Sequence, residues 1–324
     1  MVIDTHAHIN DEIYSNLDEL IAEMPNDNLE KIVCASADKK GSIKAVEIAN
    51  KNKNIYAMIG LHPDNTFEFD QEFVSFVKEN ATNKKVVAIG EIGLDYHSEN
   101  YDKELQQKVF LEQLKLAHEF SLPVVIHVRD AYDDLLSILK SHKDLITNSG
   151  IIHCFSGSLE IAREFIKLGF KIAFGGVLTF KNARKSVEVA SQLDLKYLVV
   201  ETDCPWLCPE PHRGEINEPK NVNYVVQKLA DIKKYAKRKT WTNFARKHIS
   251  SFSKTRKIGL MYEWYFRHFK KTWFYVQKKI WTKFYHGHKF ARCNCKWRRN
   301  WKWRRSARNW NGCRNTNKGT CKKM

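Results

Sequence analysis

Two histidines one residue apart, His6 and His8, stand at the end of an apolar run that begins at Val2. Alternate side chains of a β-strand point to the same face, so Asp4, His6 and His8 are expected to share one face. Neutral imidazole is the commonest metal ligand in proteins. The pair therefore indicates a metal site, although two surface histidines near the start of the chain would give the same pattern.

More ionisable side chains stand where other apolar runs end. They are His62, Glu91, Asp95, His127, Arg129, His153, Glu201 and Asp203. Charged groups inside apolar segments are costly unless they are paired or bind a metal ion. Any one of them could be a satisfied core group, but a shared metal site explains the whole set better.

Short apolar runs alternate with longer amphipathic segments throughout the first 232 residues, and this alternation predicts the fold. The runs predicted to be strands are 2–8, 31–36, 55–63, 85–95, 122–130, 150–155, 171–176 and 197–203. Strands that alternate with helices favour a parallel sheet, and eight such units favour a closed α/β barrel of the (β/α)₈ TIM type. In that fold the catalytic residues lie at the C-terminal ends of the strands, where the ionisable residues stand. The alternative, an open doubly wound sheet, would need a glycine-rich turn after the first strand, and THAHINDE has none.

Charge divides the 324 residues into two parts. Residues 1–232 contain 25 Lys and Arg against 36 Asp and Glu, whereas residues 233–324 contain 29 against one acid, Glu263. Eight of the nine tryptophans and none of the seven prolines fall in the second part. We therefore expect a hydrolase barrel over 1–232 and a basic, Trp-rich tail over 233–324 that forms no domain. Disorder or out-of-frame translation of the gene would explain such a tail.

Cellular location is suggested by what the chain does not contain. No apolar run reaches about 18 residues, and no signal-peptide pattern opens the chain, so no membrane association is expected. The eight cysteines show no disulfide-framework spacing. These features favour a cytoplasmic protein with reduced thiols, and no obligate protein partner is predicted.

Several motifs on different predicted strands together resemble the TatD family of metal-dependent deoxyribonucleases, which belongs to the amidohydrolase superfamily. They are DTHAHI, GLHP, AIGEIGLDYH, LPVVIHVRDA, IIHCFSGS and VVETDCPWLCPEPHRGEINEP. The resemblance covers residues 1 to about 232 and implies a (β/α)₈ barrel that binds two divalent metal ions. It implies that His6, His8 and Asp203 hold one ion, that Glu91 bridges both, and that His127 and His153 hold the second.

The chemistry of these side chains agrees with that implication. Imidazoles and carboxylates suit Zn, Mn, Fe or Ni, and with water ligands also Mg. Two neighbouring ions can clamp a phosphodiester, so DNA is the expected substrate. Asp203 and Glu91 are the expected catalytic residues, with Asp203 orienting the attacking water. Glu201 would support the ligands from behind, although a buried ion pair is an equal alternative.

Cations and an aromatic side chain near the predicted site could contact a nucleic acid. His62, Arg129, His212 and Arg213 could meet substrate phosphates, and Tyr96 could stack on a base. Each of the four cations could equally be a solvated loop residue, and for Tyr96 packing under a loop is the commoner case. The net charge of −11 over residues 1–232 repels polynucleotides at long range, which favours processing of ends or single strands over duplex interiors.

Two other functions remain open. The same scaffold hydrolyses amides and esters, so an amide or ester hydrolase or an aminoacyl-tRNA deacylase is one alternative. The other is a nucleic-acid binding protein led by the basic tail, because a cationic, aromatic-rich segment suits single-strand binding.

Overall fold

The computed structural model describes residues 2–236, so the predictions for residues 237–324 lie outside the described range. Eight parallel strands form one sheet in which each strand pairs with the next along the chain. They are β1 (Val2–Ala7), β2 (Leu29–Cys34), β3 (Ile55–Ile59), β4 (Val86–Asp95), β5 (Val124–Arg129), β6 (Gly150–Ile152), β7 (Lys171–Phe174) and β8 (Leu198–Val200).

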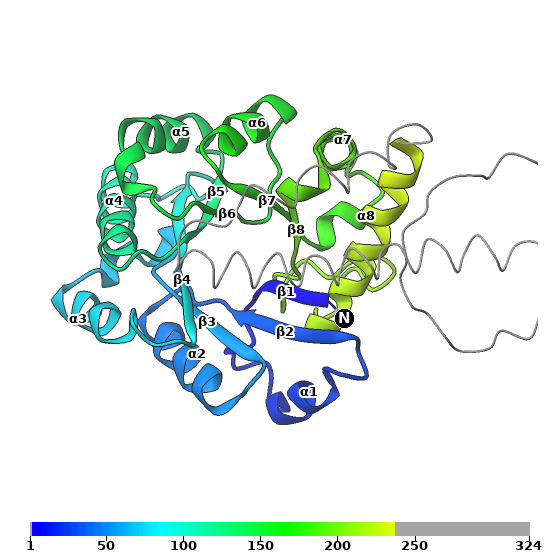
Figure 1. Cartoon of the computed structure of the whole chain (residues 1–324), viewed down its shortest axis with the longest axis horizontal. Coiled ribbons are helices and arrows are strands. Elements are labelled where there is room, and N and C mark those ends of the chain that lie inside the picture. The colour runs from blue at the N-terminus through cyan, green and yellow to red at the C-terminus, as the bar shows by residue number, and fades with distance from the viewer. Residues whose placement is uncertain (1, 237–324) are drawn as a thin grey trace, which may run out of the picture.

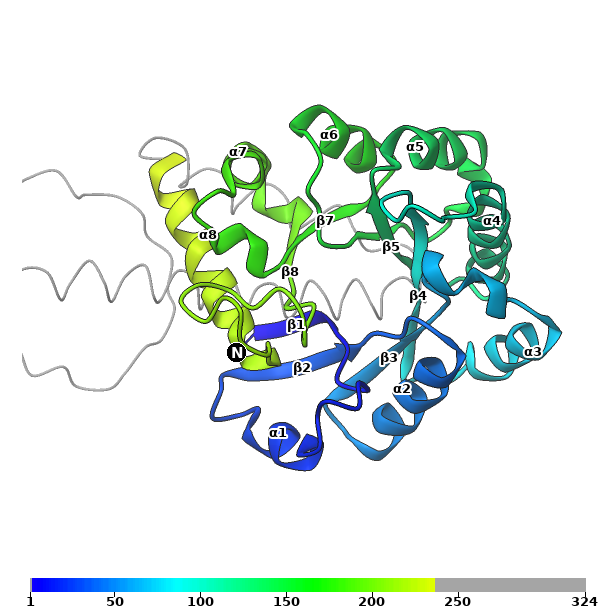
Figure 2. The same cartoon turned by 180° about the vertical axis from the view of Figure 1, so that it is seen from behind.

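A ring of helices surrounds the strands, as the two opposite views in Figures 1 and 2 show. They are α1 (Leu17–Glu23), α2 (Lys39–Lys51), α3 (Gln71–Asn80), α4 (Lys103–Glu119), α5 (Tyr132–Ser141), α6 (Leu159–Lys167), α7 (Arg184–Gln192) and α8 (Val222–Ala236). Side-chain caps start several of them; the carboxylate of Asp70, for example, accepts a hydrogen bond from the backbone N–H of Phe73 at the start of α3. The predicted (β/α)₈ barrel is confirmed.

The two faces of the strands build two separate apolar cores. One core lies between the strands and the helices and includes large residues such as Phe73, Phe110 and Phe165. The other contains one or two smaller side chains from most strands and fills the barrel interior: Val33, Ala35, Met58, Ala88, Val125, Ile151, Ala173 and Val199. Because side chains alternate along a strand, these interior positions define which later residues also point inward.

The seam between β1 and β8 closes the barrel through isolated hydrogen bonds. The backbone N–H of Asp203 donates to the carbonyl of His6 over 2.9 Å, and the hydroxyl of Thr5 donates to the carbonyl of Val200 over 3.1 Å. Asp4, buried in the seam, accepts hydrogen bonds from the backbone N–H groups of both His6 and Thr202. Asp203 and His6, both predicted to bind metal, are therefore joined directly although they lie 197 positions apart in the sequence.

All eight predicted strands are present, but several end earlier than predicted. The runs 55–63, 150–155 and 197–203 keep strand pairing only as far as Ile59, Ile152 and Val200. The residues beyond them enter loops at the C-terminal rim. Among the described residues, no helix is both long and apolar enough to cross a membrane.

Candidate metal centre

On several strands, the ionisable residue at the rim comes two positions after an apolar residue of the barrel interior, so both face inward. Two residues after Val125 comes His127, and two residues after Ile151 comes His153. On β8, the same alternation leads from Val199 to Glu201, the first residue after the strand. Asp203 lies in the loop beyond, with a φ of 57°, and the hydrogen bond from its N–H to the carbonyl of His6 places it beside β1. The alternation that fills the barrel with apolar side chains thus also directs His127, His153 and Glu201 inward, and the seam adds Asp203.

Glu91 joins this group only because β4 is irregular. Counting in twos from the interior residue Ala88 leads to Gly90 and not to Glu91, but the pairing of β4 with β5 shifts between Ile89 and Ile92. Gly90 permits the close approach there, since a Cβ atom on it would lie 2.8 Å from the Cβ atom of Val125. Glu91, 4% exposed, consequently points inward among the histidines.

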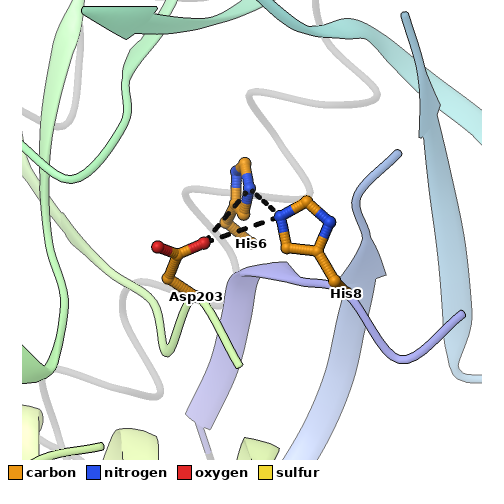
Figure 3. A group of neighbouring side chains, drawn as sticks. All are labelled: His6, His8 and Asp203. Carbon is orange, nitrogen blue, oxygen red and sulfur yellow. Dashed lines mark hydrogen bonds and ion pairs between the residues drawn. The ribbon is translucent and has the colours of Figure 1, made fainter. Parts of the chain in front are cut away.

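His6, His8, Glu91 and Asp203 form a compact cage. His6 Nε2 lies 3.1 Å from both His8 Nε2 and Glu91 Oε2, and 3.7 Å from Asp203 Oδ1. His8 Nε2 lies 3.5 Å from Glu91 Oε2 and 3.6 Å from Asp203 Oδ1. Figure 3 shows the side chains of His6, His8 and Asp203 converging, the two histidines from the end of β1 and Asp203 from the loop after β8. Tetrahedral ligands about 2.0–2.1 Å from a metal ion are about 3.3–3.4 Å apart, close to these five distances.

The other oxygen of Glu91 faces a second pair of histidines. Glu91 Oε1 lies 3.0 Å from His127 Nδ1 and 3.5 Å from His153 Nε2. Asp95, at the end of β4, lies 2.8 Å from His127 Nε2 and fixes that ring from its far side. The two oxygens of Glu91 therefore point toward two different groups of potential ligands.

Glu201 lies behind His153 and holds the loop that follows it. One oxygen of Glu201 accepts a hydrogen bond from the backbone N–H of Cys154 over 2.7 Å. The other, Oε2, pairs with His153 Nδ1 over 3.1 Å. His6 Nδ1 is buried without a hydrogen-bond partner. A buried set of imidazoles and carboxylates that leaves such a polar atom unmet fits a site that binds divalent cations.

The carboxylates dominate the electrostatics of the cluster. Burial favours the neutral form of His8, but hydrogen bonds to Asp203 and Glu91 outweigh it and raise the pKa of His8 to about 9. Burial also opposes ionisation of Glu91, yet the neighbouring histidine charges, those of His153 and His6 first, hold the pKa of Glu91 well below its ordinary value. Ionised carboxylates in a buried site attract any available cation, a proton or a metal ion.

The residues predicted to contact phosphates lie at different distances from the cluster. His62, in the loop after β3, borders the cluster, because its Nε2 lies 4.0 Å from Glu91 Oε1. Burial lowers the pKa of His62 to about 4, so its ring is neutral near pH 7 and contributes no positive charge. Arg129 ends β5 with an exposed side chain, at the rim of the barrel.

His212, Arg213 and Tyr96 are engaged with other side chains. His212 pairs with Glu215 and with the hydroxyl of Tyr224, both over 3.1 Å. The guanidinium of Arg213 lies 4.2 Å from the ring centre of Phe180. Tyr96 stacks on Tyr101 and donates a hydrogen bond to Asp134 over 3.0 Å. Tyr96 is thus packed under a loop, and the structure does not join these three residues to the histidine cluster.

Two residues near the cluster received no role from the sequence. Asp95 was noted at the end of a strand, but its contact with His127 depends on strand register. Trp206, in the loop after β8, has its ring centre 4.9 Å from that of His8. The only sequence signal for Trp206 was its place three residues after Asp203.

Comparison with known proteins gives the family of this site. The family model described as TatD related DNase matches residues 3–252. The chain belongs to the TatD family. Its TatD relatives include the uncharacterized metal-dependent hydrolase YabD of Bacillus subtilis, which is 44% identical over 234 residues, 72% of this chain and 91% of YabD. An uncharacterized metal-dependent hydrolase of Methanocaldococcus jannaschii, MJ1582, is 35% identical over 71% of this chain and 88% of its own.

Solved structures of TatD proteins have the same fold. The TatD homologue YjjV of Escherichia coli superimposes with a TM-score of 0.68 at 32% identity, covering 71% of this chain and 90% of YjjV. A TatD-family hydrolase of Entamoeba histolytica superimposes with a TM-score of 0.64 at 27% identity, covering 72% and 91%. The chain is therefore a metal-dependent hydrolase of the TatD family, and its candidate metal ligands are those of the cluster described above.

Proposed function

We propose that this TatD hydrolase cleaves phosphodiester bonds of DNA, at ends or in single strands, with two divalent ions bound at the histidine cluster. The divided contacts of Glu91 carry the proposal, because its two oxygens lie 3.1 Å from His6 Nε2 and 3.0 Å from His127 Nδ1. A carboxylate that faces two separate ligand groups is suited to bridge two cations.

In this arrangement His6, His8 and Asp203 would hold one ion, His127 and His153 would hold the other, and Glu91 would contribute one oxygen to each. When bound, such ions supply Lewis acidity to the phosphoryl oxygens and lower the pKa of water. Asp203 would orient the attacking water and could accept its proton because it is ionised: burial raises its pKa, but the charge of His153 and the hydrogen bond with His8 outweigh burial and hold the pKa below its ordinary value. The exposed cation of Arg129 is available at the rim for a non-bridging phosphate oxygen.

Restriction to ends and single strands rests on charge. The barrel carries a net charge of −11 over residues 1–232, so attraction to DNA depends on the bound ions and on local cations. A flexible end can enter the rim of a barrel, whereas a duplex interior presents two charged backbones to an acidic surface. Ends and single strands of DNA are therefore the expected substrate, and we expect no membrane and no obligate protein partner.

The test is a hydrolysis assay with the purified protein and with added Mg, Mn, Zn, Fe or Ni. Labelled single-stranded and duplex oligonucleotides are compared with small ester and amide substrates and with an aminoacyl-tRNA, each with and without a chelator. We expect chelator-sensitive, metal-restored cleavage of single strands and ends. Glu91→Gln should remove this activity, whereas Glu164→Gln, a matched change in a surface ion pair on α6, should not. Hydrolysis of the esters or amides alone would favour the other hydrolase functions.

A further inference from the structure

Trp206 presents an exposed indole at the edge of the metal centre. Its side chain is 50% exposed, although an indole is among the largest apolar groups a protein can bury. The indole and the His8 imidazole meet edge to face, with ring centres 4.9 Å apart and planes inclined by 74°. An aromatic surface therefore lies one side chain away from a candidate metal ligand.

The backbone around Trp206 is held in place, so its exposure is built into the fold. The N–H of Trp206 donates to the carbonyl of Asp203 over 3.0 Å, and its own carbonyl accepts from the side chain of Asn217 over 2.8 Å. Asn217 is fully buried and also donates to the carbonyl of Thr202. On the other side, the carbonyl of Leu207 packs so closely on Gly176 that a Cβ atom there would lie 1.9 Å from it.

The same loop exposes other apolar side chains beside this aromatic surface. Leu207 is 38% exposed and Ile216 is 57% exposed. Single exposed apolar residues are ordinary, but an exposed indole fixed against a hydrolytic centre is a surface for a flat, apolar group of the substrate. Nucleobases stack on aromatic side chains whatever their identity, and an unpaired base has a free face for this contact.

We propose that Trp206 stacks on an unpaired nucleobase next to the scissile phosphate, so that the enzyme selects unpaired nucleotides. This rests on the proposed function and adds a determinant of specificity to it. A base inside a duplex has both faces covered by its neighbours, so it must leave the stack before it can contact the indole. Trp206 thereby gives a structural reason for preferring single strands and frayed ends over duplex interiors.

The experiment compares two single-stranded oligonucleotides that differ only by an abasic nucleotide beside the scissile phosphate. The full-length, metal-loaded wild type is measured against Trp206→Ala, Trp206→Phe and Ile43→Ala, the last being an exposed apolar residue on the outer helix α2. Cleavage by the metal-loaded proteins gives kcat and KM. Fluorescence anisotropy of the labelled oligonucleotides with the same proteins, without added metal, gives their binding affinity. Phosphate contacts made by the basic C-terminal residues are common to both oligonucleotides and cancel in their ratio.

We expect Trp206→Ala to raise KM roughly tenfold or more for the base-containing oligonucleotide and to change the abasic one little, with the same pattern in binding. Trp206→Phe should retain most of the preference, and Ile43→Ala all of it. Equal effects of Trp206→Ala on both oligonucleotides, or no cost of base removal in the wild type, would overturn the inference alone. Wild-type protein that cleaves neither oligonucleotide would overturn the proposed function and the inference with it.

Discussion

The carboxylate of Asp4 accepts two hydrogen bonds from Thr202 across the seam of the barrel. Its Oδ1 accepts the backbone N–H of Thr202 over 2.9 Å, and its Oδ2 accepts the threonine hydroxyl over 2.5 Å. Oδ1 also lies 3.2 Å from the backbone nitrogen of His6, which donates to it. Asp4 therefore connects the backbone of one candidate ligand, His6, to the residue that precedes another, Asp203.

Replacing Asp4 should loosen the metal centre without removing any ligand. Asp4→Ala leaves two buried N–H groups and a hydroxyl without an acceptor, so we expect a loss of about 1–3 kcal/mol in the free energy of unfolding. Because the seam positions His6 and Asp203, metal affinity should fall as well. Urea unfolding and metal titration measure the two effects. Thr202→Ser, which retains both donors, is the matched control; an Asp4→Ala protein with wild-type stability and metal affinity would contradict the prediction.

If Glu91 contacts two metal ions, its replacement by glutamine should lower both the amount of bound metal and the turnover. Glu91→Gln preserves the shape of the side chain but removes the charge that would neutralise two cations, so bound metal should fall to one ion or fewer. Turnover should fall by about 10³-fold or more, because charge stabilisation at the reacting group is a large part of catalysis. Elemental analysis and steady-state kinetics test this. Near wild-type turnover at saturating metal would show that Glu91 does not bridge.

Metal binding should release protons at neutral pH. Despite burial, hydrogen bonds to Asp95 and Glu91 raise the pKa of His127 to about 9, and hydrogen bonds to Asp203 and Glu91 raise that of His8 to about 9. A ligand must be deprotonated to bind, so an ion displaces these protons at pH 7. The pKa of His153 is raised further, to about 10, because the charges of Glu201, Glu91 and Asp203 outweigh its burial. Apparent metal affinity should therefore rise with pH until about pH 10, beyond the usual imidazole range near 6.5.

Calorimetric titration in buffers with different ionisation enthalpies counts the released protons directly. We expect at least one proton released per protein at pH 7, and a smaller number at pH 9.5. Metal affinity that does not change between pH 7 and pH 9 would mean that these imidazoles are already neutral in the metal-free protein.

Most of the fold and much of the cluster follow from local patterns in the sequence. Alternation along the strands predicts the inward direction of His127 and His153, because each comes two residues after an interior residue, Val125 or Ile151. Asp203 lies three residues beyond the end of β8 with a φ of 57°, so the loop sets its direction. Glu91 breaks that rule, and only the register shift against β5 brings it inward. Composition could not predict this shift, since it arises from the fit of two strands around Gly90.

Contacts between loops that are distant in the sequence are the other feature of the site that could not be predicted from the sequence. Trp206 meets His8 because the loop after β8 folds back over the seam, and Tyr96 turns away because Asp134 and Tyr101 engage it. A single sequence shows which rim residues are aromatic or charged. It does not show which of these residues are held by neighbouring side chains, as Tyr96 is, and which remain exposed beside the metal centre, as Trp206 does.

That residues 233–324 form no domain stays a prediction, since all but the first four of these residues lie outside the described range. It holds 29 Lys and Arg, eight Trp and a single acid, whereas the barrel before it is acidic. The relatives YabD and MJ1582 align over 88% or more of their own length with no more than 72% of this chain. More than a quarter of this chain is therefore unmatched in each of these two comparisons, while the family model matches as far as residue 252.

We propose that out-of-frame translation produces that composition. Runs of the glutamate codon GAA become AAG or AGA, which encode Lys and Arg, when they are read in a shifted frame. A methionine codon followed by G gives TGG, which encodes Trp, and a genetic code that reads TGA as tryptophan would remove off-frame stops as well. We therefore predict that shifting the frame near codon 233 restores a short, acidic, amphipathic ending.

The nucleotide sequence tests this prediction directly. If neither alternative frame encodes such a helix, or if the segment resists proteolysis in the purified protein, it is a genuine part of the protein. Its cationic and aromatic side chains would then be best explained as a nucleic-acid binding arm.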